Sequence, residues 1–270
     1  MAIGLSSGPV VPQTVGGFSS VRPKRRLRLV MAISGLDKSG KTHQGLTAPS
    51  LMAYANLDTG LEGVSEKFEK DGKKILSKDY RVVITPDMAG NVEKIAYAAN
   101  KVWEEFKSDM RAAWKSPLIR TTVVDVESET WPLIRLARFG KLTQVMPHHY
   151  GPVNAEYEGF YNEVYDSDKN LILLDRMKDD GETKIVGGKE LFVKNGKLVR
   201  SGYKQIPYMV QVNMLAQCDP FAEAGNRFSV TIVNCRQNPD LIGMILPEPM
   251  CSFSTIAQMV YPDSQPSDWE

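Results

Sequence analysis

Residues 35–42 read GLDKSGKT, a match to G-x-x-x-x-G-K-[ST], the pattern of a phosphate-binding loop. The apolar run 27–34 precedes this octapeptide and predicts a buried parallel strand, and the residues from Lys41 onward predict a helix. A chance match in a glycine-bearing loop is the alternative, but strand, loop and helix in this order are the context that the motif requires. The octapeptide therefore predicts a nucleotide-binding α/β protein.

The residue types of the loop predict how it would hold phosphates. Gly35 and Gly40 let the backbone bend so that successive N–H groups face the phosphates, and the start of the helix adds a positive dipole end. Lys41 is expected to reach the β- and γ-phosphates, and the Thr42 hydroxyl is expected to ligate Mg²⁺. The expected nucleotide contacts are Gly35, Leu36, Asp37, Lys38, Ser39, Gly40, Lys41, Thr42 and His43.

Composition narrows the protein class. The chain has 270 residues, of which 42% are hydrophobic and 24% charged, with a net charge of +1. It can therefore bury a sizeable core, and a nucleic-acid partner would have to be held by a local basic patch. The three cysteines have neither C-x-x-C spacing nor an even count, which indicates free thiols in a reducing cytosol. The pair His148-His149 has no spaced metal-ligand motif beside it, and no membrane span or signal peptide is visible, so we expect a cytoplasmic protein.

The chain divides into a flexible arm over residues 1–21, rich in Gly and Pro, one α/β domain over 22–261, and a polar, frayed tail over 262–270. A basic run opens the domain, and its density could hold the phosphates of a nucleic-acid backbone. A solvated start to the first strand explains the same charges equally well. The basic residues are Arg22, Lys24, Arg25, Arg26 and Arg28.

Strands and helices are expected to alternate, which implies a mostly parallel sheet with helices on both faces. After the first strand, the predicted strands are 50–57, 80–85, 119–125, 170–175, 207–215 and 227–234. Helical periodicity covers 91–114 and, less clearly, 131–139 and 153–165. Between 184 and 199, Asn195-Gly196 predicts a β-hairpin turn, so the C-terminal part should extend the sheet in a partly antiparallel way.

Asp125 ends an apolar strand about eighty residues after the phosphate-binding loop. A carboxylate fixed there can hold the water shell of Mg²⁺ beside the γ-phosphate, which is the Walker B role. Hydrolysis also needs a group that orients the attacking water, and Glu62, Glu127 and Glu129 are candidates. Each of these three could instead be a solvated loop charge.

Together these segments resemble the phage-encoded RecA-like P-loop ATPases, some of which are single-strand annealing recombinases. The resemblance covers residues 27–258. It is carried by GLDKSGKT, by LDTGLEG at 57–63, by TTVVDVESETW at 121–131, by NLILLDR at 170–176 and by RFSVTIVNCRQNPDL at 227–241. It implies a RecA-like fold, ATP and Mg²⁺ as cofactors, and hydrolase activity.

The resemblance also implies roles for single residues. An acid after the second strand activates the water, which favours Glu62, although the family usually places this Glu beside the strand-end Asp; Asp58, Glu62 and Glu127 therefore stay open. The strand-end sensor would be Asp175, with Arg176 or Lys178 close by. Because such ATPases form rings or filaments, a neighbouring subunit would supply a cationic finger. The candidates are Arg176, Lys204, Arg227 and Arg236.

Single-stranded DNA is the expected polynucleotide partner, since aromatic side chains beside cations stack bases without sequence preference. Besides the basic run, the loop 177–189 and five aromatic residues are candidates for DNA contact: Tyr150, Tyr157, Phe160, Tyr161 and Tyr165. Four of these, from 157 to 165, share one helical face, which favours core packing. A packaging or helicase motor and a nucleotide switch with little turnover remain alternatives, whereas the absence of N-K-x-D argues against a GTPase.

Overall fold

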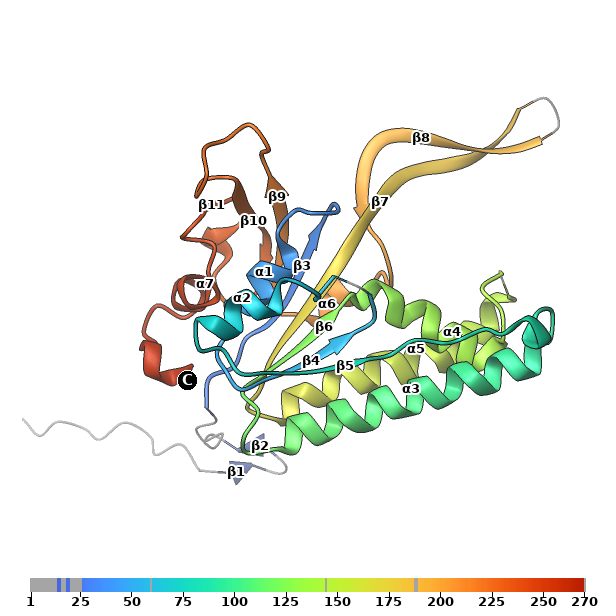
Figure 1. Ribbon diagram of the computed structural model, residues 1–270, viewed down its shortest axis with the longest axis horizontal. Helices are drawn as coiled ribbons and strands as arrows, with labels where there is room; N and C mark the ends of the chain where they lie inside the picture. The colour runs from blue at the N-terminus through green and yellow to red at the C-terminus, as the bar shows by residue number, and fades with distance from the viewer. Residues whose placement is uncertain are drawn as a thin grey trace, which may run out of the picture.

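A twisted central sheet organises the computed structural model, which describes residues 14–15, 18–19, 26–58, 60–143, 145–186 and 189–269. The strand order in the sheet is β11-β10-β9-β3-β7-β6-β4-β5, and β8 pairs with β7 outside this order (Figure 1). The strands are β3 (Val30–Gly35), β4 (Met52–Asn56), β5 (Ile75–Asp79), β6 (Thr121–Asp125), β7 (Asn170–Val186), β8 (Lys189–Arg200), β9 (Val212–Cys218), β10 (Phe228–Cys235) and β11 (Ile245–Pro247). A separate antiparallel pair joins β1 (Thr14–Val15) to β2 (Phe18–Ser19).

Six neighbouring strands, from β5 to β9, run parallel, whereas β10, β11 and β8 pair antiparallel with their neighbours. The helices are α1 (Lys41–Leu46), α2 (Ser65–Lys70), α3 (Val92–Lys115), α4 (Thr130–Phe139), α5 (Pro147–Asn162), α6 (Ile206–Met209) and α7 (Phe253–Val260). No helix in the described ranges is long and apolar enough to cross a lipid bilayer.

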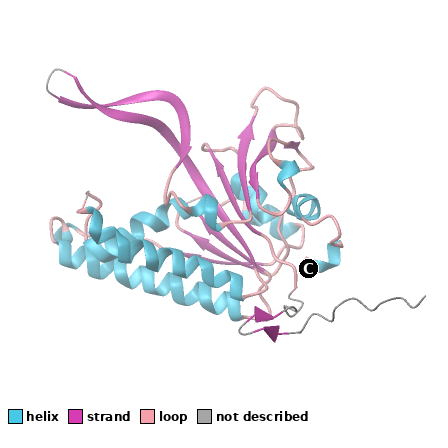
Figure 2. Ribbon diagram, turned by 180° about the vertical axis from the view of Figure 1, so that it is seen from behind, coloured by secondary structure: helices cyan, strands magenta, loops and turns pink. Residues whose placement is uncertain are grey.

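Helices cover both faces of the sheet because successive strand residues point to opposite sides. In β3, Met31 and Ile33 pack in the core that includes residues of α1 and α7, with α2 at its margin. Val30 and Ala32 pack in a second core, with α3, α4 and α5. The expected class is therefore confirmed: an α/β fold with a mostly parallel sheet, helices on both faces and a β-hairpin extension. That extension, formed by β7 and β8, projects away from the rest of the chain (Figure 2).

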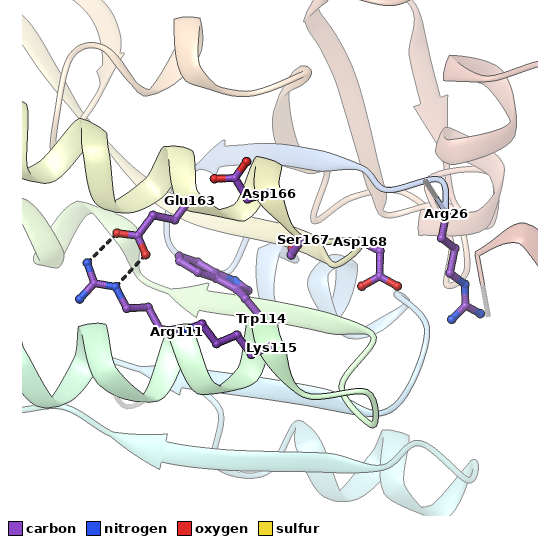
Figure 3. Close-up of a pocket in the computed structure, with 8 residues that line it drawn as sticks. All are labelled: Arg26, Arg111, Trp114, Lys115, Glu163, Asp166, Ser167 and Asp168. Atoms are coloured by element: carbon purple, nitrogen blue, oxygen red, sulfur yellow. Dashed lines mark hydrogen bonds and ion pairs between the residues drawn. The ribbon is translucent and has the colours of Figure 1, made fainter. Parts of the chain in front are cut away.

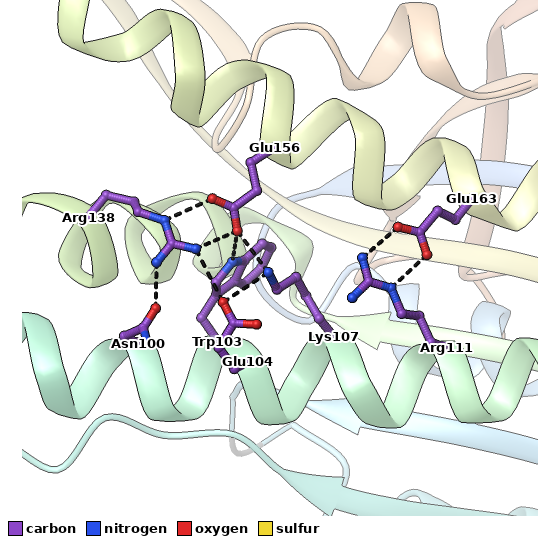
Figure 4. Close-up of polar contacts among 8 residues, drawn as sticks. All are labelled: Asn100, Trp103, Glu104, Lys107, Arg111, Arg138, Glu156 and Glu163. Atoms are coloured by element: carbon purple, nitrogen blue, oxygen red, sulfur yellow. Dashed lines mark hydrogen bonds and ion pairs between the residues drawn. The ribbon is translucent and has the colours of Figure 1, made fainter.

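The long helices α3, α4 and α5 are tied together by one polar network (Figure 4). Glu156 of α5 accepts hydrogen bonds from Trp103 Nε1 at 2.8 Å, from Lys107 Nζ at 2.8 Å and from Arg138 Nη2 at 2.6 Å. Burial opposes ionisation of this carboxyl, but the three donors prevail and lower the pKa of Glu156 to about 2. The network fixes the three helices beside the sheet, and the helix expected over 91–114 is confirmed.

Two strand predictions are wrong. The segment 80–85 contains no strand, because the edge strand of the sheet is β5, which begins five residues earlier in the chain. β5 is an edge strand with one neighbour, so its mostly exposed side chains need not be apolar. The prediction therefore assigned the strand to the more apolar residues that follow β5. The strand expected over 207–215 is replaced at its start by α6, and β9 begins only at Val212.

The predicted hairpin exists, but its turn is misplaced. Val186 of β7 pairs with Lys189 of β8, so Asn195-Gly196 does not connect the two strands, and the strand expected over 170–175 continues to Val186. Asn195 and Gly196 lie inside β8 at a register irregularity opposite Asp179–Gly181, where Gly196 takes a φ of 77°. The left-handed glycine, which suggested a turn, therefore forms part of a β-bulge.

The C-terminal tail was expected to fray, and this is wrong. Trp269 is 2% exposed and packs against Phe253 at 6.0 Å and Tyr261 at 5.6 Å between ring centroids. Arg120 Nε donates to the Trp269 carbonyl at 2.7 Å. The flexible arm proposed for residues 1–21 lies, except for β1 and β2, outside the described residues.

Candidate functional site

The phosphate-binding loop joins β3 to α1, as predicted. Gly40 has a φ of 86°, and a Cβ on it would lie 2.7 Å from the Phe228 ring. A Cβ on Gly35 would lie 2.3 Å from Ser39 Oγ and 2.8 Å from the Ala216 carbonyl oxygen. Both positions therefore need glycine for space, and Gly40 also for its backbone conformation.

Lys41 points into the loop that precedes it. Its Nζ donates to the carbonyl oxygens of Leu36 at 2.6 Å and Gly35 at 3.0 Å, and it lies 3.4 Å from Ser39 Oγ. Burial lowers the pKa of Lys41, which the carboxylates of Asp125 and Asp37 oppose. The ammonium group is thus held inside the loop, where incoming phosphates could replace its carbonyl partners.

Asp125 meets this loop from another strand. Thr42 Oγ1 donates to Asp125 Oδ2 at 3.0 Å, and the hydroxyl of buried Tyr54 donates to the same oxygen. Burial raises the pKa of Asp125, and the charge of Asp58 adds to that rise. A threonine hydroxyl beside a carboxylate is a fitting oxygen donor set for Mg²⁺, which is commonly bound by one or two protein oxygens plus substrate phosphates.

Arg176, at the pocket's edge, bridges two acids. Its Nη2 lies 2.7 Å from Asp58 Oδ2 and its Nη1 lies 2.6 Å from Glu129 Oε1. These side chains come from three different segments: the end of β4, the turn after β6, and β7. Arg176, and not Asp175, lines the cavity from β7.

A cavity of about 370 Å³ unites these groups at the carboxyl ends of the parallel strands, where ligands bind in open α/β sheets. Its lining consists of Asp37, Lys38, Gly40, Lys41, Thr42, His43, Asp58, Gly60, Val64, Asp125, Val126, Arg176 and Phe228. A larger hollow of about 610 Å³ contains no residue of the phosphate-binding loop. It lies near the end of α3 and the start of β7, and the Arg111–Glu163 pair spans part of it (Figure 3). We therefore take the smaller cavity as the candidate site.

Glu127, a candidate for activating water, does not face the cavity. It is fully buried, where Arg200 Nη2 and the Tyr157 hydroxyl donate to its carboxylate. Arg200 also binds Asp175 through two hydrogen bonds of 2.7 Å. Both acids are thus counter-ions of one buried arginine at the base of the β7–β8 hairpin. Neither carboxylate lines the cavity, so the structure does not support the catalytic prediction for Glu127 or the sensor prediction for Asp175.

This buried cluster yields a stability prediction. Arg200→Met should lower the free energy of unfolding by about 3–5 kcal/mol, because it leaves the carboxylates of Glu127 and Asp175 buried without their cation. The matched variant is Arg111→Met, which breaks a pair whose side chains are 40% and 37% exposed and should cost about 0.2–1 kcal/mol. Urea unfolding followed by circular dichroism measures both. Equal, small losses would contradict a structural role for Arg200.

The remaining predicted residues are dispersed. Glu62 is exposed and does not line the cavity, so the structure does not bring it to the phosphates. Lys204 is exposed and precedes α6 rather than a strand. Arg227 and Arg236 are also exposed and donate to the carbonyls of Ala222 and Tyr208. A finger for a neighbouring subunit must be exposed, so these three stay predictions.

The DNA-contact candidates separate into two groups. Tyr157, Phe160 and Tyr161 are at most 2% exposed in the α3–α5 core, so their prediction as stacking residues is wrong, as their shared helical face indicated. Tyr165 donates to the Met209 carbonyl at 2.6 Å, and Tyr150 packs against Trp131 and Phe139.

The basic and loop candidates have other positions. The expected loop 177–189 forms most of the outer β7–β8 hairpin. Arg28 Nη1 donates to the Ser167 carbonyl at 2.8 Å, and Arg26 lines the larger hollow. Arg22, Lys24 and Arg25 lie outside the described residues.

The sequence analysis did not identify Tyr54 or Phe228 as residues of the site. Each comes from a strand distant in sequence from the group it contacts. Because side chains alternate along a strand, the sequence of β4 could have placed Tyr54 on the sheet face that packs against α1. The hydrogen bond from its hydroxyl to Asp125 is visible only in the three-dimensional structure.

Comparison with known proteins adds limited information. No protein-family model matches the chain, and no curated protein sequence is significantly similar to it. Among solved structures, the flagellar accessory protein FlaH from Methanocaldococcus jannaschii aligns with a TM-score of 0.37 and 14% identity over 78% of this chain and 80% of that chain. An ATPase from the type III secretion system of pathogenic bacteria aligns with a TM-score of 0.37 and 9% identity over 70% and 52%. These identities are too low to transfer a function.

Proposed function

We propose that the protein binds ATP with Mg²⁺ in the 370 Å³ cavity and hydrolyses it. One observation carries this proposal: Thr42 of the GLDKSGKT loop lies 3.0 Å from Asp125, which follows 83 residues later and ends a different strand. The two local patterns lie far apart in the sequence, and the fold brings them together. Together, the GLDKSGKT loop and Asp125 supply the oxygen donors and the cation that a Mg²⁺–triphosphate needs.

Each charged side chain of the cavity would have its own role in ATP binding or hydrolysis. Lys41 would exchange its carbonyl partners for the β- and γ-phosphate oxygens, and Thr42 and Asp125 would hold the Mg²⁺, which when bound neutralises charge that develops on the phosphates. With Glu127 buried elsewhere, Asp58 is the acid that lines the cavity near Asp125 and can orient a water. Arg176, paired with Asp58, is placed to stabilise charge on the transferred phosphoryl group.

We further propose that the protein is a RecA-like ATPase that acts on single-stranded DNA in phage recombination or replication, assembled as a ring or filament. The sequence resemblance motivates this step. The β7–β8 hairpin supports it: Phe192 is 57% exposed there, two residues from the exposed Lys194, and it pairs with Thr183, which directly precedes the exposed Lys184. Exposed aromatic rings among cations are suited to stacking bases and neutralising phosphates.

This proposal predicts that the protein binds a poly-pyrimidine single strand more tightly with ATP than without. Affinity should fall steeply between 50 and 200 mM salt, by about tenfold or more if several phosphates are contacted, because backbone contacts release counterions. Fluorescence anisotropy over a salt series, phosphate release with and without DNA, and light scattering measure affinity, stimulation and assembly.

The alternatives give different results in the same assays. A nucleotide switch would bind ATP with little turnover, and a packaging motor would be stimulated mainly by duplex DNA, whereas a helicase-type motor tracks a single strand and would hydrolyse ATP without forming a stable filament on it. A monomer with no DNA affinity at low salt would refute the recombination proposal and leave the nucleotide site untouched.

A further inference from the structure

The lining of the candidate cavity contains two chemically different sets of side chains, a division that goes beyond phosphate and Mg²⁺ binding. One set is charged and includes Lys41, Asp125, Asp58 and Arg176. The other consists of two aromatic rings, those of His43 and Phe228, which the phosphate chemistry does not use. A nucleotide has the same division, since its triphosphate is charged and its base is a flat, largely apolar ring.

The two rings form an ordered pair. The centroids of His43 and Phe228 lie 6.4 Å apart, with an angle of 12° between the ring planes. On another side, Phe68 of α2 presents an edge contact to His43, at 5.5 Å and 67°. Both His43 and Phe228 are half-buried, so packing holds each ring while part of it still borders the cavity.

The position of the pair beside the phosphate-binding loop is also fixed. Phe228 begins β10 and packs against Gly40 so closely that a Cβ there would lie 2.7 Å from the ring. His43 directly follows Thr42 in the first turn of α1. The aromatic pair is thus contiguous, within one cavity, with the groups that would hold the phosphates.

The edge of the His43 imidazole carries two ring nitrogens, which add hydrogen-bonding capacity beside the stacking surface.

We propose that His43 and Phe228 form the nucleobase platform of the site, on which the base of the nucleoside triphosphate lies. This inference rests on the proposed nucleotide binding and specifies its substrate: a base-bearing triphosphate, with purines preferred over pyrimidines because their larger rings stack over more area. Stacking on an aromatic side chain contributes about 1–3 kcal/mol per base, which corresponds to about fivefold to 150-fold in affinity.

The test compares ATP with inorganic tripolyphosphate, which has the phosphates but no base. Isothermal titration calorimetry with Mg²⁺ measures both ligands on wild type and on Phe228→Leu, which keeps an apolar side chain against Gly40. We expect Phe228→Leu to weaken ATP about tenfold and to leave tripolyphosphate unchanged, with Phe228→Tyr restoring ATP affinity. His43→Ala should show the same selective loss, and Tyr97→Leu, which removes an exposed ring on α3, should leave both affinities unchanged.

The outcomes separate this inference from the proposed function. Equal weakening of ATP and tripolyphosphate in Phe228→Leu and in His43→Ala would show that the rings only support the loop, and unchanged ATP affinity in both would also overturn the platform. If wild type binds neither ligand, the proposed nucleotide site itself fails. Thermal unfolding of each variant identifies one that does not fold, in which case the other carries the comparison.

Discussion

Lys41→Ala is expected to lower ATP turnover by about 10²-fold to 10³-fold and to weaken ATP binding. The reason is electrostatic: Lys41 is the buried cation of the loop, and its ammonium lies within 3.4 Å of Gly35, Leu36 and Ser39, the backbone and hydroxyl groups that surround the phosphate position. Alanine leaves the loop backbone in place, because Gly35 and Gly40 set its shape, but removes the charge that would meet the β- and γ-phosphates. Phosphate release under saturating ATP and Mg²⁺ measures turnover.

The control for Lys41→Ala is Lys70→Ala, which removes an exposed lysine from α2 and does not line the cavity. It should retain wild-type turnover and affinity. If Lys41→Ala turns over ATP at the wild-type rate while remaining folded, the GLDKSGKT loop is not the phosphate site, and the proposed function fails with it.

The parts of the site that were predictable are those encoded in contiguous residues. GLDKSGKT has its roles because glycine, lysine and threonine occur at fixed spacing, and Asp125 could be recognised because an apolar strand ends in an acid. Parallel strands place their carboxyl ends along one edge, so two such strand ends had to lie near each other in the sheet. The fold class follows from the same alternation of strands and helices.

The direction of a side chain after a strand end was not predictable. Glu127 follows Asp125 by two residues, yet it enters the core beneath Arg200 instead of the cavity. Its partner lies 73 residues away at the end of β8, and no sequence pattern around either residue indicates that the two form an ion pair. Asn195-Gly196 shows the same limit, since a left-handed glycine fits a turn and a bulge equally well and only the strand register decides.

Asp125→Asn is expected to keep nucleotide affinity measured without Mg²⁺ but to lose Mg²⁺-dependent hydrolysis, by about 10²-fold or more. Asparagine has nearly the same shape, and its carbonyl oxygen can still accept the hydrogen bonds that Thr42 and Tyr54 donate. What it lacks is the negative charge that holds the ion. Calorimetric titration of ATP with EDTA and with Mg²⁺, beside phosphate release, separates these effects.

Asp58→Asn is the matched comparison for Asp125→Asn, because both carboxylates line the same cavity and end neighbouring strands. If Asp58 orients the water, its variant should slow hydrolysis yet keep the gain in ATP affinity that Mg²⁺ provides, since it does not hold the ion. Asp125→Asn should lose that gain. The reverse pattern, with Mg²⁺-dependent affinity lost only in Asp58→Asn, would move the metal-holding role to the end of β4. In that case the hydrogen bond between Thr42 and Asp125 would serve only to fix the start of α1 against β6.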